Sequence, residues 1–160
     1  MEAQAPVQAF LRPSMWFCGV RNLHMFKEIW QIPNATPEKC VQSLANTVKK
    51  LQNTESTGSL EVHKIDKEGG FIQIYSYTNT CGWLDVVEVQ FRPAREFGTE
   101  ASALSFSSGL FPVTVPLSFV WNIIFFWAPF SGNGFNKKRL HSLRTNMDIP
   151  NITVEPVCGC

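Results

Sequence analysis

Apolar and polar residues alternate with a period of two through the middle of the chain, and this pattern predicts β-strands. The alternation is clearest in Phe71–Tyr77 (FIQIYSY) and Trp83–Phe91 (WLDVVEVQF), and it is weaker in Leu60–Ile65 and Ala103–Ser108. A glycine-containing turn, Asp66–Gly70 (DKEGG), separates Leu60–Ile65 from Phe71–Tyr77. Links this short favour hairpins, so we predict that the strands pair antiparallel.

A spacing of three to four residues between apolar positions predicts helices before and after these strands. One helix has Thr36 as its N-cap, Pro37 at its first position and an apolar face that extends to Leu51. We predict a second helix over Asn136–Arg144, close to the end of the chain. Within Trp16–Trp30, an apolar stripe at this spacing predicts another short helix. The residues of the stripe are Val20, Leu23, Phe26 and Trp30.

Together these elements predict an α+β fold, with an antiparallel sheet of about four strands and helices packed on one face. The length of 160 residues suits a single domain, 1–160. We expect a loose N-terminal arm at about residues 1–14. We also expect a C-terminal tail at about residues 149–160, because Pro150 and Pro156 interrupt that part of the chain.

The longest apolar segment, Leu110–Phe130, lies in a run from Ala101 to Asn136 that contains no charged residue and no histidine. Its length would match a membrane-spanning helix of about 20 residues. Three prolines interrupt it, however, at Pro112, Pro116 and Pro129. A helix over the uninterrupted part, Leu117–Ala128, would reach only about 18 Å. We therefore predict an extended approach followed by a short helix or a hairpin.

This apolar segment has three interpretations: it adds to the core, it dips into a bilayer surface, or it spans the membrane. Our first functional hypothesis is a non-enzymatic, peripheral membrane or lipid-contact module, in which basic residues after the segment meet anionic headgroups. The expected contact residues are Phe119, Trp121, Ile124, Phe125, Trp127, Lys137 and Lys138.

Two other functions remain open for the same segment. It could act as a lid over a small apolar ligand, in a binding domain or an enzyme whose pocket is lined by Tyr75, Asp85 and Asn136. It could instead form a protein–protein interface, including one between copies of this chain, because exposed apolar surface serves partners and membranes alike.

Composition and charge exclude some classes of partner. The net charge of +1 gives no argument for binding nucleic acid, which usually requires a strongly basic surface. The first residues lack the pattern of a secretory signal peptide, and the five cysteines lack disulfide-framework spacing. We therefore expect a cytoplasmic protein, peripheral on a membrane and not secreted. Cys158 and Cys160 resemble a doubly prenylated C-terminus and are candidate lipidation sites.

The polar residues predict a structural network and no catalytic, cofactor or metal site. Histidines and cysteines lack metal-ligand spacing, and no nucleotide-binding glycine motif occurs. Asp85 and Glu88 are three apart in a predicted strand, so they point to opposite faces, which argues against a two-carboxylate acid–base pair. Asp85 lies on an apolar face, where an unpaired carboxylate is costly to bury. We predict that it pairs with Arg139 or bonds to Asn136.

Three short motifs occur along the chain: Trp83–Val89 (WLDVVEV), Ser105–Ser108 (SFSS) and Gly134–Leu140 (GFNKKRL). Over roughly Pro37–Leu143 they resemble domain-of-unknown-function family 1499, with departures at Val86 and Ser108. The resemblance implies an antiparallel α+β fold and no particular activity. It also implies that Leu110–Phe130 is an insertion before the last helix.

Overall fold

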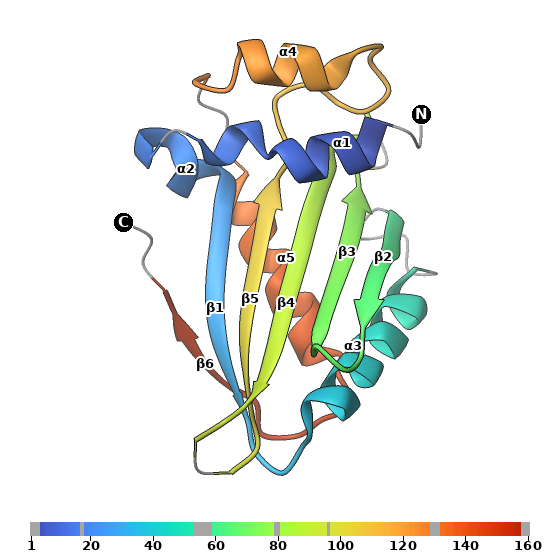
Figure 1. Ribbon diagram of the computed structural model, residues 1–160, viewed down its shortest axis with the longest axis vertical. Coiled ribbons are helices and arrows are strands. Elements are labelled where there is room, and N and C mark those ends of the chain that lie inside the picture. Colours follow the sequence, from blue (N-terminus) through green and yellow to red (C-terminus); the bar gives the residue numbers. More distant parts are fainter. Residues whose placement is uncertain are drawn as a thin grey trace.

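The computed structural model describes residues 4–16, 18–52, 59–78, 81–95, 97–128 and 132–157. Within these residues the strands form one six-stranded sheet in the order β2-β3-β4-β5-β1-β6, and every neighbouring pair is antiparallel (Figure 1). The strands are β1 (Met25–Ile32), β2 (Ser59–Asp66), β3 (Phe71–Tyr77), β4 (Leu84–Pro93), β5 (Thr99–Ser107) and β6 (Thr153–Pro156). The α+β class and the antiparallel sheet are as the sequence predicts.

Strands β2 to β5 form a meander in chain order, because each is joined to the next by a hairpin. Gly70 shows why the turn before β3 needs glycine. Its φ angle is +67°, and a Cβ atom at this position would lie 2.4 Å from the carbonyl oxygen of Phe91. The same close approach lets the Phe91 amide donate to the Gly70 carbonyl at 2.7 Å.

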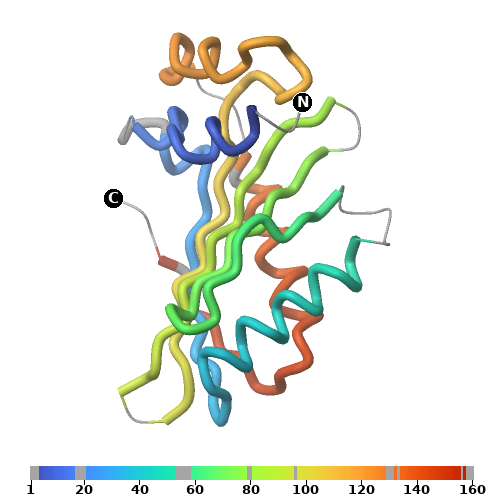
Figure 2. Tube along the Cα trace, turned by 45° about the vertical axis from the view of Figure 1, so that its right-hand side comes forward, coloured from blue at the N-terminus to red at the C-terminus, as the bar shows by residue number. Residues whose placement is uncertain are grey.

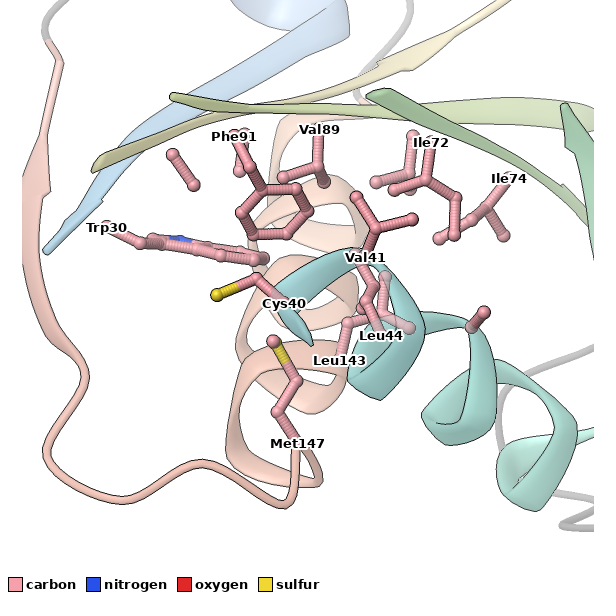
Figure 3. Close-up of a cluster of buried hydrophobic side chains, with 14 of the residues drawn as sticks. Trp30, Cys40, Val41, Leu44, Ile72, Ile74, Val89, Phe91, Leu143 and Met147 are labelled. Carbon is pink, nitrogen blue, oxygen red and sulfur yellow. The ribbon is translucent and has the colours of Figure 1, made fainter. Parts of the chain in front are cut away.

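Helices α3 (Pro37–Leu51) and α5 (Asn133–Thr145) cover one face of the sheet (Figure 2). The N-cap prediction for α3 is confirmed, since the Thr36 hydroxyl accepts from the Lys39 amide at 3.4 Å. The main core lies between these helices and the sheet (Figure 3). It includes Trp30, Cys40, Val41, Leu44, Ile72, Ile74, Val89, Phe91, Leu143 and Met147.

The expectation that helices pack on one face only is wrong. Helix α1 (Gln4–Leu11) lies against the opposite face of the sheet, where its buried Ala5 and Ala9 join a second apolar cluster. That cluster also contains Tyr75, Leu84, Val86, Phe106 and Val113. Residues Leu84–Val87 of β4 are all buried, so the start of this strand is covered on both faces. Such a strand needs a second layer to shield it.

Helices α1, α2 (Cys18–His24) and α4 (Ser118–Ile124) gather at one end of the sheet (Figure 1). The prediction of a single helix within Trp16–Trp30 is wrong in its second half, because α2 ends at His24 and β1 follows at once. Phe26 and Trp30 are four residues apart. They therefore share a face in a helix and equally in a strand, and the spacing could not distinguish the two.

Both chain ends contain elements that we did not predict. The segment expected to be a loose arm contains α1, and the segment expected to be a tail contains β6. Strand β6 pairs with β1 over four residue pairs, from Gln31 with Thr153 to Glu28 with Pro156. Short segments of this kind carry little pattern of their own, and long-range partners hold them in place.

Candidate functional site

The predicted short helix of the apolar segment is present as α4, which is seven residues long. At about 1.5 Å per residue it reaches about 10 Å, a third of a bilayer core of about 30 Å. Within the described chain, no helix has the length and apolar character needed to cross a membrane. Phe130 and Pro129 of the apolar segment lie outside the described residues.

The apolar segment folds back on itself through a buried asparagine. The side-chain amide of Asn122 accepts from the Phe111 amide at 2.7 Å and donates to the Phe111 carbonyl at 3.1 Å. Gly109 allows this approach, since a Cβ there would meet the Asn122 side chain at 2.2 Å. We did not single out Asn122 from the sequence. The available signal was a lone amide within an otherwise apolar helix.

Helix α1 is bound to the start of α4 by two glutamines, which we also missed. Gln4 and Gln8 are four residues apart and share one helix face. Gln8 donates to the Ser118 hydroxyl at 2.7 Å and accepts from the Ser108 hydroxyl at 3.1 Å, and it is fully buried. Gln4 accepts from the Ser118 amide at 3.1 Å, so it caps the N-terminus of α4 from another element.

Large apolar side chains remain exposed where α1 and α4 meet. Trp121 is 45% exposed and Trp127 is 56% exposed, while Phe119 and Phe125 are partly buried. Phe10 of α1 is 83% exposed. The centroid of the Trp16 ring lies 5.8 Å from that of the Phe126 ring, so the segment after α1 contacts the segment after α4. We refer to this surface as the apolar cap, and its members are Trp16, Leu117, Trp121, Ile124 and Trp127.

The basic cluster after the apolar segment divides into two parts. Lys137 and Lys138 are exposed near the start of α5, and the Lys137 ammonium lies 5.8 Å from the centroid of the Phe26 ring. Arg139 points inward. Its Nη2 donates to Asp85 Oδ2 at 2.7 Å, and the two side chains are 10% and 9% exposed. The predicted pairing of Asp85 with Arg139 is therefore confirmed.

Asn136 organises the polar network around this ion pair. Its side-chain oxygen accepts from Arg139 Nη1 at 3.0 Å and from the Ser105 hydroxyl at 2.7 Å. Its side-chain nitrogen donates to the His24 carbonyl at 2.8 Å and to the Ser107 hydroxyl at 3.3 Å. The network thus ties α5 to β4, β5 and the junction between α2 and β1. Each of these network side chains has a hydrogen-bond partner, as burial requires.

A hollow of about 390 Å³ lies beside the ion pair, where β4 begins, β5 ends and α5 begins. It is lined by Thr78, Trp83, Asp85, Ser107, Gly109, Leu110, Gly132, Phe135 and Arg139. Of the three residues expected to line a ligand pocket, Asp85 lies there. Tyr75 belongs to the apolar cluster on the opposite face of the sheet, and Asn136 lies in the network beneath the hollow.

Tyr75 and Glu88 lie on the face that α1 covers. Glu88 pairs with Arg12 and accepts from the Gln73 amide at 2.8 Å, so it points away from Asp85 as the strand period predicts. Tyr75 stacks on His63 with ring centroids 4.2 Å apart. Burial, with the nearby Tyr77 and Glu88 adding to its effect, raises the pKa of Tyr75 to about 12. The phenol therefore stays protonated at neutral pH.

The described residues contain no group of three His, Cys, Asp or Glu side chains that could hold a metal ion. Cys158 and Cys160, the candidate lipidation sites, lie outside the described residues. No model of a known protein family matches the chain. Comparison with curated proteins also finds no match. The resemblance to domain-of-unknown-function family 1499 therefore stays a prediction.

Proposed function

We propose that this protein is a peripheral module that contacts anionic lipid surfaces through the apolar cap, assisted by Lys137 and Lys138. The observation that carries this proposal is the exposure of Trp121 and Trp127 at one end of the molecule, next to an exposed Trp16 whose ring contacts Phe126. Soluble proteins rarely expose clustered apolar side chains of this size unless the cluster contacts a membrane or a partner.

The composition of the cap favours a lipid surface. Tryptophan and phenylalanine are the side chains that concentrate at headgroup depth. The run from Ala101 to Asn136 contains no charged residue, and two exposed lysines follow directly after it. An apolar surface bordered by cations is the arrangement that penetrates shallowly while the lysines stay with the anionic headgroups. Each lysine near such a surface contributes about 1 kcal/mol.

The way α4 is held also supports shallow contact. Asn122 closes the segment on Phe111, and Gln4 and Gln8 bind its start to α1. The cap is therefore part of a folded scaffold. On this proposal the protein would lie on a bilayer with the α4 end facing the lipid and the sheet extending away from it.

Vesicle co-sedimentation tests the proposal with phosphatidylcholine vesicles, prepared with and without phosphatidylserine. The wild type should pellet with the anionic vesicles. A Trp121→Ser/Trp127→Ser variant should lose about tenfold in affinity per residue, because each large apolar side chain contributes about 1.5–3 kcal/mol when buried. The matched control is Phe97→Ser, which changes an exposed phenylalanine in the turn between β4 and β5.

Equal pelleting of the double variant and the wild type would overturn the proposal. A wild type that stays in the supernatant with both kinds of vesicle would do so as well. If that protein were also a monodisperse dimer by light scattering, the cap would instead be an interface between copies of this chain.

A further inference from the structure

We propose that the hollow beside the Asp85–Arg139 pair binds a small uncharged amphiphile with a hydroxyl head. The volume of about 390 Å³ falls within the range of small-molecule sites. The hollow differs from a larger one of about 590 Å³ at the other end of the sheet, which is lined mostly by exposed residues. This inference does not depend on the proposed membrane contact.

Besides Thr78 and Ser107, the walls of the hollow contain three large apolar side chains, one of which is held in place by a hydrogen bond. Trp83, Leu110 and Phe135 supply large apolar surfaces. The indole nitrogen of Trp83 donates to the Leu110 carbonyl at 2.7 Å, which fixes the ring as a wall and satisfies its polar group. Phe135 is exposed on the first turn of α5, so it stands at the mouth. An alkyl chain would replace water along these three side chains.

The floor of the hollow is polar but carries no net charge. Asp85 and Arg139 both line it, each about nine-tenths buried, and their charges cancel. Arg139 has five N–H donors, and its bonds to Asp85 and Asn136 leave others for a ligand. The Asp85 carboxylate accepts from Arg139 through Oδ2 and has further lone pairs.

This floor selects the head group of the ligand. A carboxylate would lie against Asp85 and an ammonium against Arg139, so either would meet a like charge in a partly desolvated site. A hydroxyl avoids both contacts, because it can donate to Asp85 and accept from Arg139 at once. A neutral head therefore fits the site without separating the buried pair.

Titration with octanol, octanoate and octylammonium, without vesicles, tests the proposal. The readout is the NMR resonance of the Trp83 indole N–H, with assignment by Trp83→Phe. Octanol should bind at least about tenfold more tightly than the two charged probes. Phe135→Ala should weaken octanol binding several-fold, and Phe97→Ala, the matched control, should leave it unchanged. The Trp121→Ser/Trp127→Ser variant should retain octanol binding even where it loses vesicle binding, which separates the two proposals.

A charge variant directly tests the preference of the floor for an uncharged head group. Asp85→Asn keeps the size of the side chain and removes its charge, so the Arg139 charge is no longer cancelled. Octanoate should then bind more tightly than octanol. The proposal is overturned if no probe shifts the Trp83 resonance, if octanoate binds the wild type as tightly as octanol, or if Phe135→Ala has no effect. None of these three outcomes needs the Asp85 variant, so they decide the matter even if Asp85→Asn does not fold.

Discussion

Arg139 and its two lysine neighbours are all cationic, yet only Arg139 points inward, with a side chain that is 10% exposed. The planar guanidinium binds two acceptors at once, Asp85 through Nη2 and Asn136 through Nη1. A lysine ammonium is a more strongly hydrated point charge, and Lys137 and Lys138 stay exposed. The three residues point in different directions from α5, and only Arg139 is on the side that faces the sheet.

Asp85→Ala should destabilise the fold by about 3–5 kcal/mol, because it leaves the Arg139 charge buried without its partner. The thermal melting temperature measures this effect. Asp148→Ala is the control, since Asp148 pairs with Lys50 on the surface and that pair contributes less than about 1 kcal/mol. Equal melting temperatures for the two variants would contradict the structural role of the buried pair.

Tyr75 should make stability fall at high pH. Its pKa is about 12 in the folded protein against 10.0 for an ordinary tyrosine, so between these values the folded state holds more protons than the unfolded chain. The contribution is complete below about pH 10 and is lost as the pH rises through about 12. Denaturant unfolding over this pH range should show a steeper loss for the wild type than for Tyr75→Phe. Parallel curves would contradict this.

Among the elements, α1 and α4 depend on each other. Helix α1 is eight residues and α4 is seven, and helices this short are marginal in isolation. Gln4 and Gln8 connect them by bonds to the Ser118 amide and hydroxyl. The two helices therefore form one cooperative unit at the end of the sheet, and the apolar cap depends on that unit.

Gln8→Ala should open this unit. It removes the acceptor of the buried Ser108 hydroxyl, and it removes one of the two glutamine partners of the buried Ser118 hydroxyl, at a cost of about 1–3 kcal/mol. Hydrogen exchange should become faster in α1 and α4 and stay unchanged in α3. The matched control is Gln42→Ala, which removes an exposed glutamine that bonds to Asn46 on the surface of α3. If both variants exchange like the wild type, the glutamine contacts contribute little.

For the whole molecule, the arrangement of charge sets the orientation of the proposed lipid contact. The apolar cap and the start of α5 lie at the end of the sheet where β4 begins and β5 ends, while the β2–β3 turn lies at the other end. Lys137 and Lys138 are thus the exposed lysines near the cap, and Lys64 and Lys67 belong to the far hairpin.

Lys137→Glu/Lys138→Glu should weaken binding to anionic vesicles, and raising the salt concentration should reduce the difference from the wild type. Binding to neutral vesicles should change little. The control Lys64→Glu/Lys67→Glu makes the same change of net charge far from the cap. Equal losses from both pairs would mean that overall charge, and not a defined face, governs attraction to the vesicle.

The sequence by itself determined the parts of the fold that depend on local pattern. The period of two placed β3 at Phe71–Tyr77, and the Thr36 cap placed the start of α3. It also limited the partner of Asp85 to Arg139 or Asn136, because a carboxylate on an apolar strand face needs a partner, and the structure shows that the partner is Arg139. In each case the physical cause acts within a few residues or demands one kind of partner.

Only the tertiary structure decided β1, β6, α1 and the hollow. Strand β1 pairs with β5, for example Phe26 with Ser105, and β6 exists through its pairing with β1. Helix α1 is held by groups more than a hundred residues away along the chain, such as Ser118. The hollow arises where three elements meet, with walls from Trp83, Leu110 and Phe135. These features depend on long-range contacts, which no local period of apolar residues records.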